Sequence, residues 1–344
     1  MKAVAIREHG DLSVVHVEEL PKPAIQGDEV LVKVLYAGLN HLDIWVCKGR
    51  PGVSLNAPHI LGSDAVGVVE AIGEHVRNVK VGETVVVYPG LGCGRCESCA
   101  VGERSLCESF GIVGLSRPGT FAEYVVLPAG NVYPKPSYLS EQEAGGFVLA
   151  CLTAWRMLVT RACVRPGDCV LIHGIGGGVA LYALQWTKII GAQSIVTSSS
   201  DEKLSKAKEL GADYAINYKS EDVVERVKAI TGGLGADVAV DAVGAATWPL
   251  DFAAVHKGGR IVLCGVTTGP TAEANLQALY WNQLTVLGST LGSIGDLQQM
   301  ARAATTNRLR PIVDRIFPLD KAQEALKRMA DGRQFGKIVL QVSR

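Results

Sequence analysis

The sequence lacks any apolar run of the roughly 18 residues that a membrane span requires. Its start, MKAVAIREHGDL, also lacks the apolar core of a secretory signal. These two absences predict a cytoplasmic protein that is not bound to a membrane. No long block of one charge sign is present either, since 34 basic residues balance 34 acidic ones. This argues against a nucleic-acid-binding surface and favours a small molecule as the partner.

The composition is that of a globular protein of more than one domain. Of 344 residues, 48% are hydrophobic and 20% are charged, which excludes a disordered or fibrous chain. A chain of this length exceeds the usual size of a single hydrophobic core. We therefore expect two domains of ordinary size.

The first 130 residues have the pattern of antiparallel β-structure. Short apolar runs such as EVLVKVLYAG and AVGVVEAIG are interrupted by glycine or proline every eight to twelve residues. The pattern changes at Ser140, which with Glu143 forms a capping-box pair in front of apolar residues at helical spacing. We therefore expect a new domain to begin near residue 135.

Six β-branched or apolar runs follow, most of them separated by amphipathic helical segments. They lie at 169–173, 194–199, 214–218, 237–244, 260–266 and 284–290. This alternation predicts a parallel sheet with helices on both faces. The segments DRIFPL and GKIVLQVS then return to the β pattern. We predict an α/β fold in which a doubly wound, six-stranded domain at 135–267 is inserted into a β-rich domain made of 1–134 and 268–344.

A glycine-rich turn, HGIGGGVA, connects the first of these runs to the next helix. Glycine permits a tight turn and a close approach to a pyrophosphate, whose charge is stabilised at the helix N-terminus. A simple tight turn without a ligand is the alternative, but further strand and helix units follow in register. The predicted contact residues are Gly174, Gly177, Gly178, Val179 and Ala180.

The residues after the second strand bear on which nicotinamide cofactor binds. An acidic residue there would bind a ribose 2′-hydroxyl, but the sequence has Ser198, Ser199 and Ser200, with Lys203 one turn later. Hydroxyl groups and an ammonium suit a 2′-phosphate, and Tyr218 is placed to close the same pocket. Asp201 and Glu202 lie nearby, and these residues could simply begin a helix. We predict NADP(H) in preference to NAD(H).

Four of the nine cysteines lie within fifteen residues, at C-x2-C-x2-C-x7-C spacing. Four thiolates so close together can enclose Zn²⁺ in a tetrahedron with no open position, which predicts a structural zinc. Disulfides are the alternative, which a reducing compartment disfavours. The predicted ligands are Cys93, Cys96, Cys99 and Cys107.

These motifs together resemble the medium-chain dehydrogenase/reductase superfamily. The similarity extends over essentially the whole chain and includes AGLNHLDIW, LGSDAVGVV, GTFAEYVVLP, LTAW, DAVG, LGST and GKIVL. It implies a Rossmann domain inserted into a GroES-like substrate domain, whose zinc lobe spans 92–108. The superfamily contains zinc alcohol dehydrogenases with a structural and a catalytic zinc, and quinone or enone reductases that lack the catalytic one.

The positions of the catalytic zinc ligands carry other residues in this chain. By comparison with the zinc alcohol dehydrogenases, Asn40 replaces the first ligand, Ser63 followed by Asp64 replaces the second, and Leu149 replaces the third. These side chains do not form the usual zinc shell. The pattern from Asn40 to Asp43 is similar to that of quinone oxidoreductases. The resemblance therefore implies an enzyme with a structural zinc only.

The resemblance also implies further cofactor contacts and an oligomer. His41 and Lys337 match pyrophosphate-contacting positions, and Thr153 matches the residue that packs on the nicotinamide. A homodimer or homotetramer joined through the cofactor domains is expected, with 284–290 as an edge strand. The segments expected to border the nicotinamide contain Val243, Gly244, Gly265, Val266, Ser289, Thr290 and Leu291.

The sequence thus leads to the hypothesis of an NADPH-dependent reductase of quinones or α,β-unsaturated carbonyls that uses no catalytic metal. A conjugated acceptor spreads the charge that hydride transfer creates, so hydrogen-bond donors such as Asn40 can suffice. Asp43 is the second predicted catalytic residue and would orient Asn40 or His41. Two alternatives remain open. One is an alcohol dehydrogenase with an unusual metal shell that includes Asp43 and Asp64, and the other is an NADPH-binding protein without turnover.

Overall fold

The computed structural model describes residues 1–49 and 55–343, which form two compact units. Unit 1 consists of Met1–Ala150, Ser293–Gly295 and Ala301–Arg344, and unit 2 of Cys151–Gly292 and Asp296–Met300. None of the described helices is long and apolar enough to cross a lipid bilayer.

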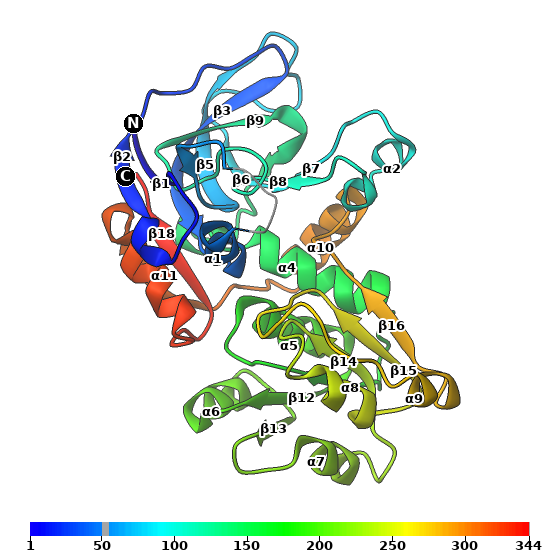
Figure 1. The fold of residues 1–344 in the computed structure, drawn as a ribbon. Coiled ribbons are helices and arrows are strands. Elements are labelled where there is room, and N and C mark those ends of the chain that lie inside the picture. Colours follow the sequence, from blue (N-terminus) through cyan, green and yellow to red (C-terminus); the bar gives the residue numbers. More distant parts are fainter. Residues whose placement is uncertain (50–54, 344) are drawn as a thin grey trace. The chain divides into compact units, whose positions relative to one another are not determined.

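Unit 2 contains a six-stranded sheet in which every pair of neighbours is parallel (Figure 1). The strand order is β13-β12-β11-β14-β15-β16, so the order reverses between β11 and β14. In such sheets, ligands bind at the carboxyl ends of the strands near that reversal. The strands are β11 (Cys169–Ile172), β12 (Gln193–Ser198), β13 (Tyr214–Asn217), β14 (Ala236–Asp241), β15 (Val255–Leu263) and β16 (Thr285–Gly288).

Apolar strands and the helices between them form the core of unit 2. All four residues of β11 are buried, as expected for a central parallel strand. The first crossover helix, α5 (Gly178–Ile190), buries seven side chains, among them Trp186, which packs edge-to-face on Trp155. The other helices are α6 (Asp201–Glu209), α7 (Val223–Ile230), α8 (Trp248–Ala254) and α9 (Leu276–Trp281).

Unit 1 is rich in β-structure. Its largest sheet has the order β10-β6-β5-β3-β18-β17, with β9 also paired to β3, and only β17 and β18 are parallel neighbours. A smaller sheet has the order β2-β1-β4, and β7 pairs with β8. The strands are β1 (Lys2–Ile6), β2 (His16–Glu19), β3 (Glu29–Gly38), β4 (His59–Ile60), β5 (Asp64–Ile72), β6 (Thr84–Val87), β7 (Gly90–Leu91), β8 (Gly111–Ile112), β9 (Tyr124–Pro128), β10 (Val132–Pro134), β17 (Val313–Pro318) and β18 (Lys337–Gln341).

Short helices complete unit 1. The apolar face of α11 (Ala322–Ala330) buries Ala325, Leu326 and Met329 in the core that the large sheet also lines. The others are α1 (His41–Lys48), α2 (Glu97–Ala100) and α3 (Glu141–Ala144), while α4 (Val148–Trp155) and α10 (Ile294–Thr306) contribute residues to both units. The predicted fold class, a six-stranded Rossmann sheet with a β-rich GroES-like domain, is confirmed.

The two units divide the chain at other places than the predicted 134/135 and 267/268. Residues 135–150 belong to unit 1 because the predicted capping box begins only the short α3, where Glu143 accepts hydrogen bonds from Arg310 of the same unit. Residues 268–292 belong to unit 2 because β16 pairs with β15. Composition alone does not indicate either boundary between the units, since the residues that pair across each segment are distant in sequence.

Candidate active site

The predicted catalytic residues lie in unit 1, where the ends of several elements meet. Asn40 follows β3 and immediately precedes α1, and Asp43 is the third residue of that helix. The Asn40 backbone N–H donates to Asp43 Oδ2 over 2.8 Å, which closes one half of a capping box. Asp64 begins β5, and Lys337 begins β18. Local capping and sheet pairing therefore bring the ends of β3, β5 and β18 together.

The Lys337 ammonium is the buried cation of this cluster. It donates to Leu39 O and Asn40 Oδ1, each over 2.7 Å, and to Asp64 Oδ2 over 3.2 Å. An ammonium has three protons to donate, so these oxygens use all of them. Asn40 Nδ2 also donates to Asp64 Oδ2 over 3.1 Å. We call Asn40, Asp43, Asp64 and Lys337 the polar cluster of unit 1.

The Asp43 carboxyl is the group of this cluster best suited to exchange a proton. Burial raises its pKa to about 7, although hydrogen bonds from the Asn40 and Gly62 backbones and the charge of Lys337 act in the opposite direction. Its Oδ1 has no hydrogen-bond partner among the described residues. A group whose pKa lies near neutrality is what general acid–base chemistry requires.

His41, the first residue of α1, is predicted to contact a pyrophosphate. Burial lowers the pKa of its imidazole, and the charge of Lys337 adds to this effect. The imidazole is therefore neutral at physiological pH. It can take part in hydrogen bonds, but it does not offer an anionic ligand a fixed charge.

The family's catalytic zinc does not fit the residues at its usual position. Ser63 uses its hydroxyl to donate to Val113 O, and Leu149 offers only its backbone N–H, which donates to Asp64 Oδ1 over 2.7 Å. Both carboxylate oxygens of Asp64 are thus engaged. Within the described residues, the Cys93 to Cys107 group is the single set of three or more Cys, His, Asp or Glu side chains placed to share one metal ion.

The glycine-rich turn lies at the carboxyl end of β11 in unit 2. Gly174 has a φ of 69°, a conformation that favours glycine, and Ile175 N donates to Thr197 O over 2.9 Å. Gly177 precedes α5, so Gly178, Val179 and Ala180 form its first turn. The first backbone N–H groups of a helix have no partner within it and point toward an anion placed there.

The other predicted cofactor contacts of unit 2 also follow the carboxyl ends of strands. Gly244 has a φ of 93°, and a Cβ atom there would lie 2.9 Å from Val266 Cα, so the loops after β14 and β15 are closely packed. Leu291 also has a positive φ, of 50°, which is rare for a residue with a side chain and is found at functional sites. The residues on this edge are Ser198, Ser199, Ser200, Tyr218, Val243, Gly244, Gly265, Val266, Ser289, Thr290 and Leu291.

Two further predicted cofactor contacts lie on helices of unit 2. Thr153 is a buried residue of α4, and Lys203 lies in the first turn of α6. The Ser200 hydroxyl accepts a hydrogen bond from Lys203 N and so caps α6. Asp201 Oδ1 accepts from Asn217 Nδ2 over 2.7 Å, so this carboxylate is held by the end of β13.

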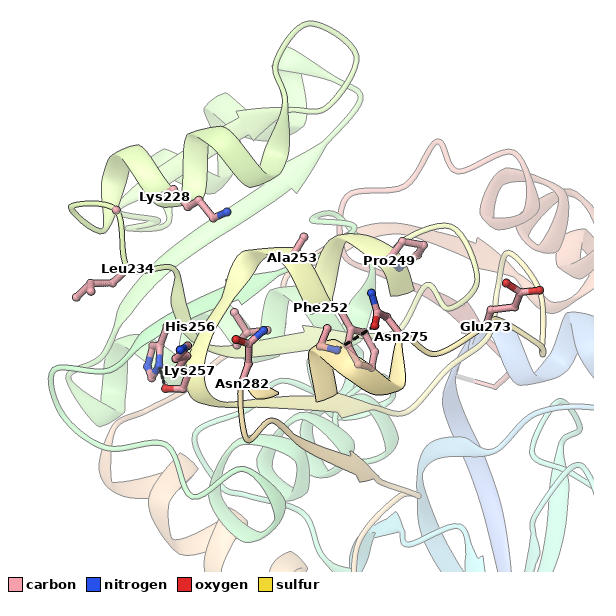
Figure 2. A pocket seen from close by; sticks show the side chains of 13 residues that line it. Lys228, Leu234, Pro249, Phe252, Ala253, His256, Lys257, Glu273, Asn275 and Asn282 are labelled. Carbon is pink, nitrogen blue, oxygen red and sulfur yellow. Dashed lines mark hydrogen bonds between the residues drawn. The ribbon is translucent and has the colours of Figure 1, made fainter. Parts of the chain in front are cut away.

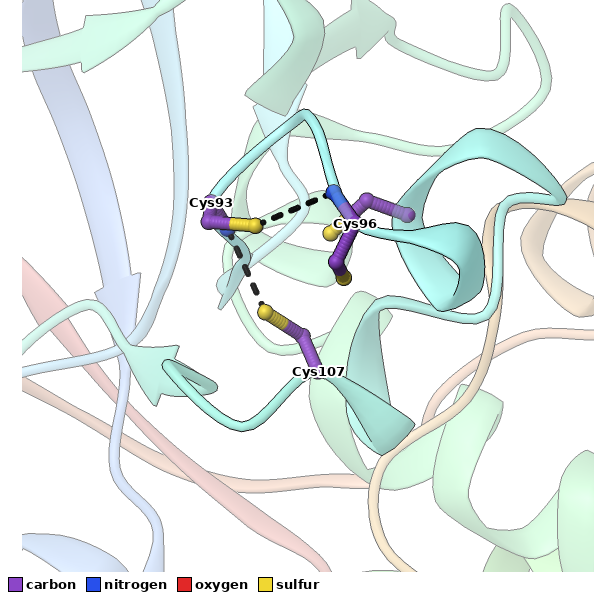
Figure 3. A group of neighbouring side chains, drawn as sticks. Cys93, Cys96 and Cys107 are labelled. Carbon is purple, nitrogen blue, oxygen red and sulfur yellow. Dashed lines mark hydrogen bonds between the residues drawn. The ribbon is translucent and has the colours of Figure 1, made fainter.

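The four clustered cysteines come together in unit 1 (Figure 3). Their Sγ atoms all lie within 4.8 Å of one another, and the tetrahedral shell of Zn²⁺ needs sulfur atoms roughly 3.8 Å apart. Hydrogen bonds from the Arg95 and Cys96 backbone lower the pKa of Cys93 to about 6, which favours the thiolate. The lobe therefore fits a zinc held by Cys93, Cys96, Cys99 and Cys107, with no open position for a substrate.

A pocket of about 600 Å³ lies elsewhere on unit 2, between residues of α7, α8 and α9 (Figure 2). Val255, His256 and Lys257, at the start of β15, line it. It is therefore at the amino end of that strand, opposite the edge where doubly wound sheets bind ligands. None of the predicted site residues lines this pocket.

Comparison with known proteins places the chain in a family. The model described as zinc-binding dehydrogenase matches residues 178–306, and the one described as alcohol dehydrogenase GroES-like domain matches residues 26–137. The chain belongs to the zinc-type alcohol dehydrogenase family of medium-chain dehydrogenases/reductases. It is thus an oxidoreductase of small molecules, and the predicted resemblance is confirmed.

Full-length relatives carry the same family name. An alcohol dehydrogenase from Geobacillus stearothermophilus is 34% identical, over 99% of this chain and 100% of its own. The crystal structure of an NAD-dependent alcohol dehydrogenase has a TM-score of 0.95 and 43% identity, with 100% of both chains covered. A cobalt- and zinc-bound thermostable alcohol dehydrogenase from Pyrobaculum aerophilum has a TM-score of 0.88 and 34% identity, with 99% of each chain covered.

These relatives correct the predicted reaction. The sequence led to a quinone or enone reductase without a catalytic metal, and that prediction is wrong, because the full-length relatives are alcohol dehydrogenases. The prediction depended on the replaced ligands at Asn40, Ser63 and Leu149. Replacement of individual ligands does not define the substrate, and in this chain Lys337 donates to Asp64 beside these positions.

Proposed function

We propose that the protein is a nicotinamide-dependent alcohol dehydrogenase that interconverts a small alcohol and its carbonyl compound. The observation that carries this proposal is the polar cluster of unit 1, in which the buried Lys337 ammonium donates to Asp64 and acts through its charge on Asp43, a carboxyl whose pKa burial raises to about 7. The family and its full-length relatives support the same reaction class.

The residues of the cluster match the needs of alcohol oxidation. The substrate carbon gives a hydride to the nicotinamide, and the substrate hydroxyl gives up a proton. Asp43, with its free Oδ1, takes that proton and returns it in the reverse direction. The Lys337 ammonium, whose protons are donated to Leu39, Asn40 and Asp64, stabilises through its positive charge the negative charge that develops on the substrate oxygen. Asp64 positions Lys337 for this role.

The cofactor is proposed to bind along the carboxyl edge of the unit 2 sheet, with its pyrophosphate at the turn from Gly174 to Ala180. His41 is the candidate contact from unit 1. We propose a preference for NADP(H), because the Asp201 carboxylate at the start of α6 is engaged by Asn217. Cofactor affinities measured for NADPH and NADH test this, and tighter binding of NADH would contradict it.

A second form of the same function uses a metal in the polar cluster. It is favoured by the unpartnered Oδ1 of Asp43, by the nearby carboxylate of Asp64, and by the cobalt and zinc named for one relative. The Lys337 ammonium would have to leave Asp64 to make room for the ion. Metal analysis separates the two forms, since one zinc per chain corresponds to the cysteine lobe alone and two per chain indicate the second form.

We also propose a homodimer or homotetramer. Strand β16 is the outermost strand of the unit 2 sheet, so its outer edge has backbone groups available for pairing with a second copy. Light scattering of the intact chain tests this proposal, and a monomer at micromolar concentration would contradict it.

The decisive experiment for the reaction is a turnover assay on the intact protein. Primary and secondary alcohols are offered with the oxidised cofactor, and aldehydes, ketones and quinones with the reduced one, while nicotinamide absorbance is followed. We expect turnover of alcohols and simple carbonyls, and a loss of about 10² to 10⁴-fold in kcat for Asp43→Asn. Turnover of quinones alone would overturn the proposal. Cofactor binding without turnover of any substrate would indicate a binding protein.

A further inference from the structure

A buried histidine immediately precedes the glycine-rich turn. His173 follows β11, and its side chain is 1% exposed. Its Nε2 lies 2.8 Å from Asp251 Oδ1 on α8, and its Nδ1 lies 3.2 Å from Thr197 Oγ1 on β12. One ring therefore connects the start of the turn with a neighbouring strand and with a helix. His173 is not among the residues predicted from the sequence, although its place directly before Gly174 could have indicated it.

A second buried carboxylate lies close to this pair. Asp241, the last residue of β14, accepts hydrogen bonds from Val243 N, Gly244 N and the Thr247 hydroxyl. It is fully buried, as is Asp251. The group formed by His173, Asp241 and Asp251 thus adjoins both the glycine-rich turn and the Val243–Gly244 loop. Both segments are proposed to contact the cofactor.

The geometry fits the protonated form of His173. An imidazolium donates two hydrogen bonds, and both of its neighbours, Asp251 Oδ1 and Thr197 Oγ1, can accept one. The titratable groups that face it are Asp251 from α8 and Asp241 from β14. Burial alone lowers the pKa of His173, but the hydrogen bond and charge of Asp251, together with the charge of Asp241, outweigh it and raise the pKa.

The charge of this group matters for an anionic ligand. With His173 neutral and both carboxylates ionised, two negative charges would be buried next to the segments that receive a pyrophosphate. Burial raises the pKa of Asp251 to about 6, while the hydrogen bond and charge of His173 act in the opposite direction, so the ionised form of this carboxyl depends on a cation beside it. The His173 imidazolium supplies that cation without contact with the solvent.

We propose that His173, paired with Asp251, is a positioning residue that fixes the glycine-rich turn and offsets the buried carboxylate charge, so that a pyrophosphate-containing cofactor binds there. The inference rests on the proposed nicotinamide-dependent function. His173 acts through the turn and does not itself touch the cofactor. Deprotonation of His173 at high pH therefore weakens cofactor binding.

The first test needs no variant. The intact protein is labelled at its histidine rings, and NMR follows His173 from pH 6 to pH 10 while calorimetry gives the dissociation constants of NADPH, NADH and ADP-ribose. We expect a doubly protonated ring at pH 7 and a loss of about tenfold in affinity for all three ligands as the ring loses its proton. A neutral His173 ring at pH 7 would overturn the proposal.

The second test uses His173→Gln and a matched control. Glutamine can donate to Asp251 but does not titrate, so this variant should bind the three ligands about five- to tenfold more weakly at pH 7, without the steep loss at high pH. His256 pairs with Asp237 over 2.9 Å, at the opposite edge of the same sheet. His256→Gln should therefore leave affinities and pH profile unchanged.

The outcomes separate the two proposals. If the unmodified protein binds no nicotinamide cofactor, the proposed function fails. If it binds the cofactor and His173→Gln has the same affinity and the same pH profile, the role of His173 is wrong and the proposed function stands. Near-ultraviolet circular dichroism of each variant checks that unit 2 is folded.

Discussion

Unit 1 contains two candidate sites, the cysteine lobe and the polar cluster, and they are built in different ways. The cysteine lobe gathers four thiols from fifteen consecutive residues. The polar cluster instead joins Lys337 to Asn40 and Asp64, across sequence separations of 297 and 273 residues. The first site is encoded by local spacing and the second by the sheet that brings β3, β5 and β18 together. Only the first kind of site is visible in a sequence.

The two sites also differ in what stabilises them. Cys93 is exposed and Cys96 and Cys99 are only partly buried, so a zinc ion bound by the thiolates would supply much of the stability of the lobe. Lys337 and Asp64 are 3% and 1% exposed, so their pairing depends on complete hydrogen bonding within the protein. Removal of one partner should therefore have different consequences in the two places.

The largest effect is expected for Lys337→Met. This change leaves the Asp64 carboxylate buried without its cation, which typically costs about 3–5 kcal/mol. Chemical denaturation at neutral pH measures the free energy of unfolding. A loss below about 1 kcal/mol would show that the ammonium is not the partner on which Asp64 depends.

Two further variants serve as controls for this prediction. In Lys337→Met combined with Asp64→Asn, the buried charge is removed as well, so a substantial part of the lost stability should return. Lys2 pairs with Asp320 over 3.5 Å at the surface, where both side chains are exposed. Lys2→Met should therefore change the stability far less.

A smaller effect is expected for Cys99→Ser in the lobe. Loss of one thiolate opens the tetrahedral shell, so the zinc content should fall below one per chain and the stability by about 2–3 kcal/mol. Elemental analysis and thermal unfolding measure the two quantities. Cys163→Ser, which changes an exposed cysteine outside the lobe, is the control and should retain the zinc. Full zinc content in Cys99→Ser would rule out a four-cysteine site.

The same contrast explains how much of the protein was predictable. Strand and helix alternation after Cys169 identified all six parallel strands, because each run has its own local period. The position of β16 in the inserted unit and of α3 in the other depends on pairing between distant residues. The family resemblance predicted that Lys337 contacts the cofactor. Nothing in the segment GKIVL indicates that its ammonium donates hydrogen bonds to Asn40 and Asp64.

The reaction class shows a second limit of prediction. The replaced ligands at Asn40 and Ser63 were visible in the sequence, but the hydrogen bonds that join Asn40 to Asp64 and Lys337 were not. The same holds for His173, whose partners Thr197 and Asp251 lie 24 and 78 residues away. Long-range polar contacts therefore form the polar cluster and the His173 group, while short-range spacing indicates the strands and the cysteine lobe.

The smallest expected effect concerns Asp43 of the polar cluster, whose contribution to the stability depends on pH. Its folded-state pKa of about 7 lies above the value of about 3.9 for an exposed aspartate, so the unfolded chain loses this proton first. Asp43 therefore contributes stability that is fully present below about pH 4 and is lost as the pH rises through 7.

The variant Asp43→Asn tests this expectation, because asparagine cannot lose a proton. Relative to this variant, the unmodified protein should become less stable between pH 5 and pH 8, by roughly 1–2 kcal/mol once local relaxation is allowed for. Denaturation of both proteins at each pH measures this difference, in which the shared carboxylates cancel. A difference that is constant with pH would show that Asp43 is ionised throughout, and the polar cluster would then lack its proton acceptor and donor.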